Sequence, residues 1–355
     1  MNGINYVPVT NKNSIYHRDG WKYCIEILTK LNNPQSSIKL IDLVEDYYLI
    51  HNKCLRYDNN QKWIGILHHP PNVVDSKLDK LLTHSNFQND LQHCIGLWTL
   101  SKYLANYLKK KLNNIPIYNT FHPVKFDFQK FSLDLFSKNK SKHIVFIGNQ
   151  DRIYSTFYNL DIPGYTKVWL SGKSFYLSLD LMYFELKKNK PLSRNDITKR
   201  ISIKNVSCYE YDKIFTNNLI IVELYDSSAN NAVLECISRS TPIFVNNVGG
   251  VSEYLGTQYP LYYDSLDVLK SKIVDHNLIC KAHQYLSKMD KSFLKSDYFV
   301  DSFIKNIAKL KILLPIKPNI QYDNRVIENV KRENSKLKKN NVLSANLNNR
   351  MLHIS

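Results

Sequence analysis

The sequence has little of what marks secreted, membrane-spanning or low-complexity chains. Six of its 355 residues are cysteine and no two form a C-x-x-C pair, which argues against a disulfide framework or a zinc site. Glycine, with 10 residues, and proline, with 12, are too scarce for a collagen-like chain. No stretch approaches the roughly 18 consecutive apolar residues of a transmembrane helix, and the N-terminus lacks an apolar signal region. We therefore expect a cytoplasmic chain.

Apolar and aromatic residues are plentiful. They make up 43% and 12% of the chain, enough to fill sizeable hydrophobic cores and to exclude wholesale disorder. At roughly 150 residues per domain, the length predicts two domains.

The net charge is strongly positive, because 48 Lys and Arg face 31 Asp and Glu to give +17. The basic residues are spread along the chain, apart from a denser stretch at 186–205 in which seven basic residues accompany Asp196. Spread charge is typical of a solvated surface, while an anionic substrate, a membrane surface and nucleic acid are the alternatives. Because the basic residues do not alternate with aromatics in one patch, we expect no nucleic-acid partner.

Short apolar runs without polar alternation recur along the chain. Such runs are typical of strands covered on both faces, as in parallel α/β sheets. They lie at 38–42, 63–67, 94–100, 115–118, 144–148, 167–172, 219–224 and 242–246. Between them, helical spacing predicts helices at 21–31, 102–112 and 230–239, the second of them capped by Ser101. Strands that alternate with helices predict an α/β fold of doubly wound sheets.

The alternation pauses once, in a polar stretch that ends near residue 140. We therefore predict one Rossmann-like lobe at 1–140 and a second at 141–315, facing each other across a cleft. Residues 316–355 are polar and basic, and we expect a flexible or partly helical tail.

The most informative stretch begins at the predicted strand 219–224. The turn after it, 225–231, brings a helix N-terminus to the carboxyl end of that strand, where backbone N–H groups can hold an anion. Glu235 lies four residues after Asn231, on the same helical face, and a carboxylate there can accept hydrogen bonds from ribose hydroxyls.

A Gly-Gly pair follows the next predicted strand. Gly249 and Gly250 allow a backbone to approach a ligand closely, and Glu253 comes three residues later. Each feature alone is more typical of an N-cap turn, a surface carboxylate or a plain turn. Their combination within about thirty residues favours a binding site.

Three segments of this stretch carry a family resemblance: Leu234-Glu235-Cys236, Thr241-Pro242-Ile243 and Val248 to Glu253. The segments resemble the C-terminal lobe of GT-B glycosyltransferases, specifically the retaining, family 4-like enzymes with an E-x7-E motif followed by G-x-P and G-G-x-x-E. The resemblance is fairly specific over about 210–265 and weaker over about 60–265. It implies two Rossmann-like lobes, with a nucleotide-sugar donor bound in the C-terminal lobe and an acceptor facing the N-terminal lobe.

The resemblance assigns roles to individual residues. Glu235 matches the second glutamate of E-x7-E, which holds the donor ribose. The first glutamate falls at Ser227, which is not acidic, so Asp226, one position earlier, is the candidate to replace it. This departure puts the identity of the sugar, and activity itself, in doubt. The implied donor-binding residues of this stretch are Ser227, Asn230, Asn231, Glu235, Gly249, Gly250 and Glu253. Thr241 stands where the family prefers glycine.

A diphosphate leaving group also needs fixed cations, because it gains charge in the transition state. Arg152, which follows strand 144–148, is the first candidate and Lys173 the second, with a solvated surface base as the alternative for each. In the first lobe, His68 and His69 directly follow strand 63–67, where a histidine can accept a proton from the acceptor hydroxyl. The candidate catalytic residues are thus His68, His69 and Asp226.

Several nucleotide and metal motifs are absent from the sequence. It has no P-loop, no early G-x-G-x-x-G and no D-x-D; the nearest approach, Glu210-Tyr211-Asp212, is expected in a loop. We therefore expect transfer without a metal or other cofactor.

The sequence thus predicts a glycosyltransferase that moves a sugar from a nucleotide sugar, such as a UDP or GDP sugar, to an acceptor hydroxyl, with retention. The acceptor is a glycan, a lipid-linked molecule or a protein, and peripheral membrane contact through 186–205 or the tail stays open. Two alternatives remain: a GT-B-like binding protein without catalysis, and a basic protein that binds polyanions or membrane surfaces.

Overall fold

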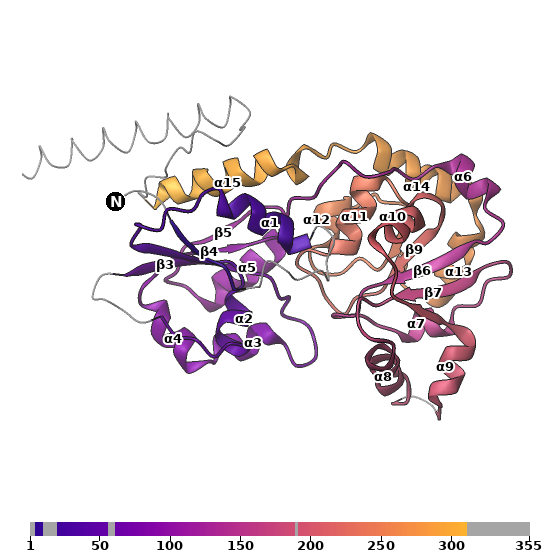
Figure 1. The fold of residues 1–355 in the computed structure, drawn as a ribbon, viewed down its shortest axis with the longest axis horizontal. Coiled ribbons are helices and arrows are strands. Elements are labelled where there is room, and N and C mark those ends of the chain that lie inside the picture. Colours follow the sequence, from indigo (N-terminus) through magenta and orange to yellow (C-terminus); the bar gives the residue numbers. More distant parts are fainter. Residues whose placement is uncertain (1–3, 10–19, 56–60, 189–190, 311–355) are drawn as a thin grey trace, which may run out of the picture.

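The computed structural model describes residues 4–9, 20–55, 61–188 and 191–310. The predicted tail at 316–355 lies outside these residues. The chain folds into two lobes side by side, each built around a parallel five-stranded sheet with helices packed around it (Figure 1). The α/β class predicted from the apolar runs is confirmed.

The strands of the first sheet lie in chain order, β1-β2-β3-β4-β5. The sheet consists of β1 (Asn5–Val7), β2 (Ile38–Ile41), β3 (Lys62–Leu67), β4 (Cys94–Thr99) and β5 (Ile117–Asn119). Its accompanying helices are α1 (Gly20–Thr29), α2 (Val44–Leu49), α3 (Lys77–Leu82), α4 (Ser85–Leu91) and α5 (Lys102–Lys111). The predicted cap of α5 is present, because the Ser101 hydroxyl accepts from Leu104 N at 3.2 Å.

The two faces of this sheet carry separate cores, because alternate residues of each strand point to opposite sides. Ile64 and Ile66 of β3 pack with α1 on one face, whereas Trp63 and Leu67 pack with the helices α2 to α5 on the other. The first face is completed from far along the chain. Helix α15 (Ser296–Lys309) runs along the first lobe in Figure 1, and its buried Phe303 lies 5.1 Å from the ring of Trp98.

The packing differs from the predicted division into 1–140 and 141–315. Phe299, Val300, Phe303, Ile304 and Ile307 of α15 belong to a core of the first lobe. In the other direction, Phe131 and Phe136, which precede residue 140, are buried in the core of the second lobe. Apolar burial drives both exchanges, since each segment covers apolar residues of the other lobe.

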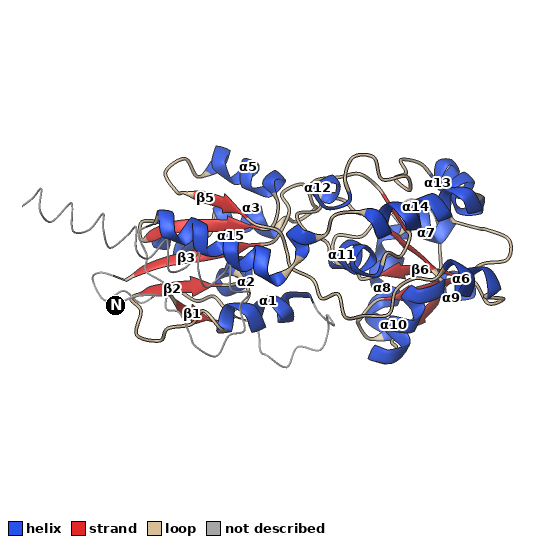
Figure 2. Ribbon diagram, turned by 90° about the horizontal axis from the view of Figure 1, so that it is seen from above, coloured by secondary structure: helices blue, strands red, loops and turns tan. Residues whose placement is uncertain are grey.

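The second sheet has the order β10-β9-β6-β7-β8, so the chain reverses direction across the sheet between β6 and β9. Its strands are β6 (His143–Ile147), β7 (Thr166–Leu170), β8 (Ser202–Lys204), β9 (Leu219–Val222) and β10 (Ile243–Val245), seen as the right-hand set in Figure 2. In doubly wound sheets, ligands bind at the carboxyl ends of the strands beside such a reversal. Here, those ends are the loops that follow β6 and β9.

The helices of the second lobe surround this sheet. They are α6 (Leu133–Lys138), α7 (Ser155–Asn159), α8 (Phe175–Leu186), α9 (Arg194–Arg200), α10 (Cys208–Asn217), α11 (Asn231–Arg239), α12 (Val251–Leu255), α13 (Leu266–Val274) and α14 (His276–Lys288), followed by the 3-10 turn η1 (Ser292–Leu294). The expectation that Glu210-Tyr211-Asp212 lies in a loop was wrong, because these three residues lie within α10, near its start. Ser207 and Glu210 make a reciprocal capping box that starts the helix.

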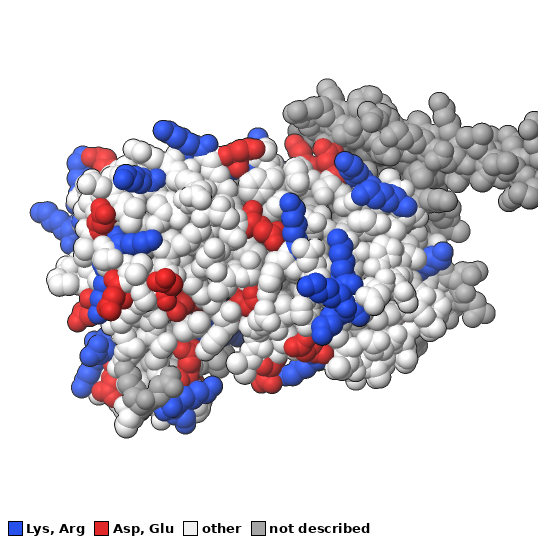
Figure 3. Space-filling view, turned by 180° about the vertical axis from the view of Figure 1, so that it is seen from behind, with Lys and Arg blue, Asp and Glu red and all other residues white. Residues whose placement is uncertain are grey.

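The surface carries its positive charge as the sequence predicts. Figure 3 shows Lys and Arg on both lobes of one face, interspersed with acidic residues. Within the described ranges, no helix has the length and apolar character needed to cross a membrane.

Candidate active site at the junction of the lobes

His68 and His69 follow β3 at its carboxyl end, and a buried glutamate holds their backbone. Glu45 Oε1 accepts from His68 N at 2.7 Å and from His69 N at 2.9 Å. Its Oε2 is buried and has no hydrogen-bond partner among the described residues. Burial therefore outweighs the two hydrogen bonds and raises the pKa of Glu45 to about 7.

The two histidine rings point to different partners. His68 Nε2 lies 2.8 Å from the carbonyl oxygen of Asp42, and its ring makes an edge contact with Trp21 at 4.1 Å between centroids. Because a carbonyl only accepts, Nε2 carries the proton, which makes Nδ1 the proton acceptor of the neutral ring. Burial lowers the pKa of His68 to about 3, so the ring is neutral at pH 7 and is a weak base.

His69 reaches the other lobe. Its Nδ1 lies 3.0 Å from the amide Nε2 of Gln150, in the loop after β6, and burial lowers its pKa to about 4. An amide nitrogen donates, so Nδ1 accepts and Nε2 holds the proton. His68 is thus anchored within its own lobe, whereas His69 bridges the two.

Asp226, in the loop after β9, also bridges the lobes. Its carboxylate accepts from Asn72 N at 2.9 Å and from the Tyr103 hydroxyl at 2.7 Å, both in the first lobe. It also accepts from Ser227 N at 2.8 Å. Tyr103 is a residue that the sequence analysis missed, although the predicted cap at Ser101 already placed it in the first turn of a helix.

Glu253 makes the second carboxylate bridge. Its two oxygens accept from Lys102 N at 2.7 Å and Tyr103 N at 2.6 Å, the first backbone donors of α5. An acid at a helix N-terminus satisfies unpaired N–H groups and complements the helix dipole. Next to it, the hydroxyls of Ser101 and Ser228 lie 2.9 Å apart. We predicted that Glu253 binds the nucleotide-sugar donor; in this structure its carboxylate instead binds the N-terminus of α5 in the first lobe.

Gly249 and Gly250 allow close packing of two loops of the second lobe. Gly249 has φ +52°, and a Cβ there would lie 2.3 Å from Asp226 Oδ1 and from Ser227 O. A Cβ on Gly250 would lie 2.4 Å from Ser228 O, and Gly250 N donates to Ser227 O at 2.7 Å. The close backbone approach that we predicted toward a ligand is here an approach to the loop after β9.

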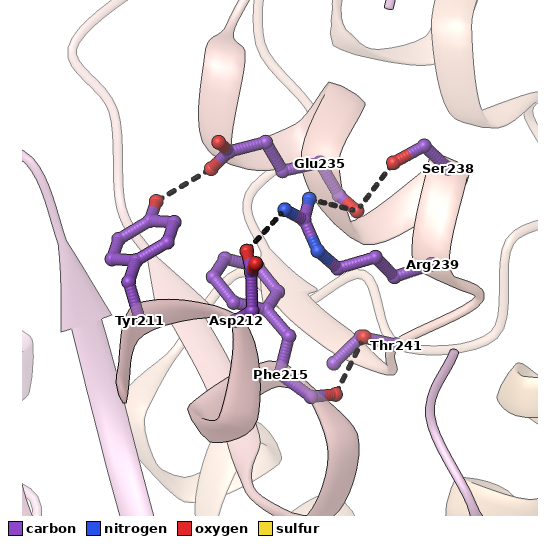
Figure 4. Close-up of polar contacts among 7 residues, drawn as sticks. All are labelled: Tyr211, Asp212, Phe215, Glu235, Ser238, Arg239 and Thr241. Atoms are coloured by element: carbon purple, nitrogen blue, oxygen red, sulfur yellow. Dashed lines mark hydrogen bonds and ion pairs between the residues drawn. The ribbon is translucent and has the colours of Figure 1, made fainter. Parts of the chain in front are cut away.

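Helix α11 begins in that loop. The Asn230 side chain caps it by accepting from Ala232 N at 3.1 Å and Val233 N at 3.3 Å, and Asn231 is its first residue. Glu235, one turn further on, is 7% exposed, and its Oε2 accepts from the Tyr211 hydroxyl at 2.5 Å (Figure 4). Burial and this carboxylate raise the pKa of Tyr211 well above its usual range. The sequence analysis named Tyr211 only within Glu210-Tyr211-Asp212 and gave it no role in the site.

The far end of α11 is tied to α10. Arg239, fully buried, donates to Asp212 at 3.0 Å, as Figure 4 shows. Thr241, which stands in place of the glycine of the resembled motif, donates its hydroxyl proton to Phe215 O at 2.8 Å. These contacts fix the helix that carries Glu235 against its neighbour.

Of the two predicted cations, Arg152 is buried and Lys173 is exposed. Arg152 Nε donates to Ile147 O at 3.0 Å and Nη1 to Gln150 O at 2.9 Å, whereas Nη2 has no hydrogen-bond partner among the described residues. Burial lowers the pKa of Arg152 to about 10, which leaves the guanidinium charged at pH 7. Its segment pairs with the end of β9 through Arg152 and Leu224.

The predicted residues thus form two groups. At the junction, His69, Asp226, Gly249, Gly250 and Glu253 join the lobes or the loops that meet there. Around the start of α11 lie Ser227, Asn230, Asn231 and Glu235, with Arg152 on the neighbouring loop. Lys173 lies after β7, where its backbone oxygen accepts from Asn205 Nδ2 at 2.7 Å. Among the residues that the structure describes, no group of three His, Cys, Asp or Glu is placed to hold a metal ion.

Comparison with known proteins identifies the fold of this chain. The sequence matches no family model and no curated protein. Solved structures do match. A sucrose-phosphate synthase from Thermosynechococcus elongatus aligns with a TM-score of 0.59 at 11% identity, over 85% of this chain and 80% of the synthase. This chain has the GT-B fold.

Two further GT-B structures align over similar lengths. An α,α-trehalose-phosphate synthase (UDP-forming) from Burkholderia vietnamiensis gives a TM-score of 0.52 at 9% identity, over 81% of this chain and 77% of the other. A trehalose-6-phosphate synthase gives 0.54 at 11% identity, over 78% and 74%. At such identities the likeness extends to the fold, and activity must be argued from the site.

Proposed function

We propose that this protein is a glycosyltransferase that takes a nucleotide sugar in its second lobe and transfers the sugar to an acceptor hydroxyl. Topology supports this location of the donor site. Only the second of the two described sheets reverses its strand order, and the reversal lies between β6 and β9. The loops that follow those strands carry Arg152 and the segment 226–231, which supply a charged guanidinium and a helix N-terminus for a diphosphate.

The observation that carries the proposal is the position of Glu235. A carboxylate that is 7% exposed lies one turn into the helix after β9, within the segment that resembles the retaining E-x7-E enzymes. Burying a carboxylate costs free energy, so such a group is kept where it binds something or holds the structure. Its bond to Tyr211 aligns one oxygen, and in the proposed site the carboxylate receives the ribose hydroxyls of the donor.

The named relatives agree with this class of donor. One aligned structure is called a UDP-forming synthase, and another, a trehalose-6-phosphate synthase, is described as an enzyme of glycosyl transfer with retention. We propose the same stereochemistry and, from the sequence, transfer without a metal. Catalysis then rests on positioning and on stabilising the leaving diphosphate by Arg152 and backbone N–H groups.

The acceptor side lies in the first lobe, where we propose that a glycan, lipid-linked or protein hydroxyl approaches His68 and His69. The weak basicity of both rings suits a mechanism in which the leaving phosphate, rather than a histidine, accepts the proton of the acceptor hydroxyl. We propose a cytoplasmic location.

Binding of nucleotides to the purified full chain tests the donor site directly. Thermal unfolding is measured with UDP, GDP, ADP and CMP and with common nucleotide sugars, each with and without EDTA. We expect one nucleoside diphosphate to raise the Tm, with no effect of EDTA, and Glu235→Gln to weaken its binding at least about tenfold.

The matched control is Glu210→Gln, which changes an exposed acid of the same lobe that caps α10. It should leave nucleotide affinity unchanged. If no nucleotide shifts the Tm, or if Glu235→Gln binds as tightly as the parent protein, the donor site is wrong. A loss of binding on adding EDTA would contradict transfer without a metal.

A nucleotide-sugar-binding protein without transferase activity is the second candidate. It is favoured by Ser227 at the position of the first glutamate and by the engagement of Asp226 with three donors. Release of the nucleoside diphosphate from a bound nucleotide sugar separates the two. Turnover that Asp226→Asn lowers by two orders of magnitude or more, at unchanged donor affinity, supports the enzyme; binding without turnover supports the alternative.

A further inference from the structure

Helix α8 exposes apolar side chains along its solvent face. Leu177, Leu181 and Phe184 are 47%, 36% and 50% exposed, and their spacing of four and three residues places them in one row. The opposite face, with Leu179, Met182 and Leu186, is buried in the core of the second lobe. The helix is therefore apolar on both faces, although only one of them has a partner within the described residues.

The first turn of α8 also exposes two aromatic side chains. Phe175 is 44% exposed and Tyr176 is 78% exposed. Single exposed apolar side chains need no explanation, but three in one row of a short helix form a patch of the kind that marks an interaction surface.

Exposed basic residues border the patch. Lys187 and Lys188 follow the last turn of α8, and Arg194 is the first residue of α9. Lys187 Nζ is 4.7 Å from the centre of the Phe184 ring, and the Arg194 guanidinium is 4.3 Å from that of Tyr183. The cations thus lie directly against the aromatic rings of α8.

The acidic residues of this region are occupied locally. Asp180 accepts from Arg194 at 2.6 Å, Glu185 from Tyr154 N at 2.8 Å, and Asp196 from Ser193 N at 2.8 Å. The sequence from 173 to 204 contains eight basic residues against these three acids. The border of the apolar patch therefore has a net positive charge.

Figure 1 places α8 and α9 together at the lower end of the second lobe. Two copies of the chain would have to bring the same basic border face to face in a symmetric dimer, which charge repulsion opposes. A negatively charged partner complements the border.

We propose that α8 docks this protein on the surface of a membrane that contains anionic lipids. The row of Leu177, Leu181 and Phe184 enters the boundary between head groups and acyl chains, as the apolar face of an interfacial helix does. Tyr176 lies at the polar level, where its ring and hydroxyl are both accommodated. The basic border binds lipid phosphates, with each Lys or Arg adding to the attraction. Docking of this kind does not depend on transferase activity.

Flotation of the full chain with lipid vesicles tests the apolar part. The vesicles consist of phosphatidylcholine with or without phosphatidylserine. The triple variant Leu177→Ser/Leu181→Ser/Phe184→Ser removes the row from positions that are already exposed, so the fold should hold, and its Tm is checked. We expect its partition onto phosphatidylserine vesicles to fall at least about tenfold.

The matched control removes exposed apolar side chains elsewhere. Ile50→Ser/Val74→Ser/Val274→Ser changes residues that are 59%, 79% and 63% exposed and lie outside α8. It should bind vesicles like the parent chain.

The basic border has its own pair of variants. Lys187→Glu/Lys188→Glu should weaken binding to phosphatidylserine vesicles about tenfold or more, and added salt should weaken binding of the parent chain. Lys109→Glu/Lys110→Glu, an equal charge change in the last turn of α5, should have little effect.

Three outcomes would overturn the proposal. The parent chain binds no vesicles; or it binds them equally well after the triple change in α8, which would assign binding to another surface; or it forms a dimer in solution that the triple change abolishes, which would make a second copy the partner.

Discussion

Both lobes are built on a parallel sheet with helices around it, but they differ in strand order and in the segments that cover the faces of the sheet. The first sheet follows the chain from β1 to β5, and one of its faces needs α15 from the far end of the described chain. The second sheet reverses between β6 and β9. Among the described strands, a topological switch point therefore occurs only in the second sheet, which is where we propose the donor site.

The carboxylates that follow the strands also differ between the two lobes. Glu45 of the first lobe stays within its lobe and holds the backbone of His68 and His69. Asp226 and Glu253 of the second lobe reach across and hold Tyr103 and the N-terminus of α5. The second lobe therefore sets the position of the first through loops that also border the proposed donor site.

The largest expected effect tests the dependence of the first lobe on α15. Phe303→Ala removes a fully buried ring that packs on Trp98 and should lower the free energy of unfolding by about 3–5 kcal/mol. Tyr298→Ala, on the same helix but 41% exposed, should lower it by less than about 1 kcal/mol. Urea denaturation measures both. Equal, small effects would mean that the first lobe does not need this helix.

The next effect concerns the packed loops of the second lobe. Gly249→Ala adds a methyl group 2.3 Å from Asp226 Oδ1 at φ +52°, and should destabilise the protein by about 3 kcal/mol or more. Gly164→Ala has a similar φ of +81° but meets nothing within 4 Å, so we expect only the backbone strain of about 1–2 kcal/mol. Thermal unfolding with circular dichroism measures the difference. Were the two variants equally unstable, conformation rather than close packing would explain the glycine.

A smaller effect tests the contact between the lobes. Glu253→Ala leaves the N–H groups of Lys102 and Tyr103 without their acceptor and should lower stability by about 1–2 kcal/mol. Glu253→Gln keeps one acceptor oxygen and should lose less. Small-angle X-ray scattering should show a larger radius of gyration for Glu253→Ala. An unchanged radius and stability would show that this bridge does not hold the lobes together.

The last test is a pH dependence within the first lobe. The pKa of Glu45 is about 7 in the folded protein, above that of an ordinary glutamate, so the folded state binds this proton more tightly than the unfolded state. Its contribution to stability is full below about pH 4.5 and is lost as the pH rises through about 7. Glu45→Gln should flatten the stability curve over that interval, as measured by urea denaturation at each pH. If the variant keeps the slope of the parent, another group titrates there.

Much of the secondary structure was predictable, because its signals are local. All eight predicted strands are present within a few residues, and Ser101 caps α5 as expected. Strands β1 and β8 were missed. Each is only three residues long at a sheet edge, and β8 reads SIK within the basic stretch, so its pairing with β7 rather than its composition makes it a strand.

The elements that carry the candidate site residues were more predictable than the contacts of those residues. The motif segments placed Glu235 on a helix after a buried strand, and the structure has it there. Nothing around Glu253 indicated that its partner is the helix beginning at Lys102, about 150 residues earlier in the chain. Similarly, Tyr211 reaches Glu235 because α10 packs beside α11, a relation between helices that no local pattern encodes.

The sequence by itself determined the α/β class, the order of its elements and the stretch that resembles a donor site. Runs of apolar residues, helix caps and turn residues act over a few neighbours, so the chain carries these decisions locally. Only the tertiary structure decided that α15 completes the first lobe, that Asp226 and Glu253 join the two lobes, and that α8 leaves an apolar row exposed. These are choices among distant partners, and burial and hydrogen bonding select them only once the whole chain has packed.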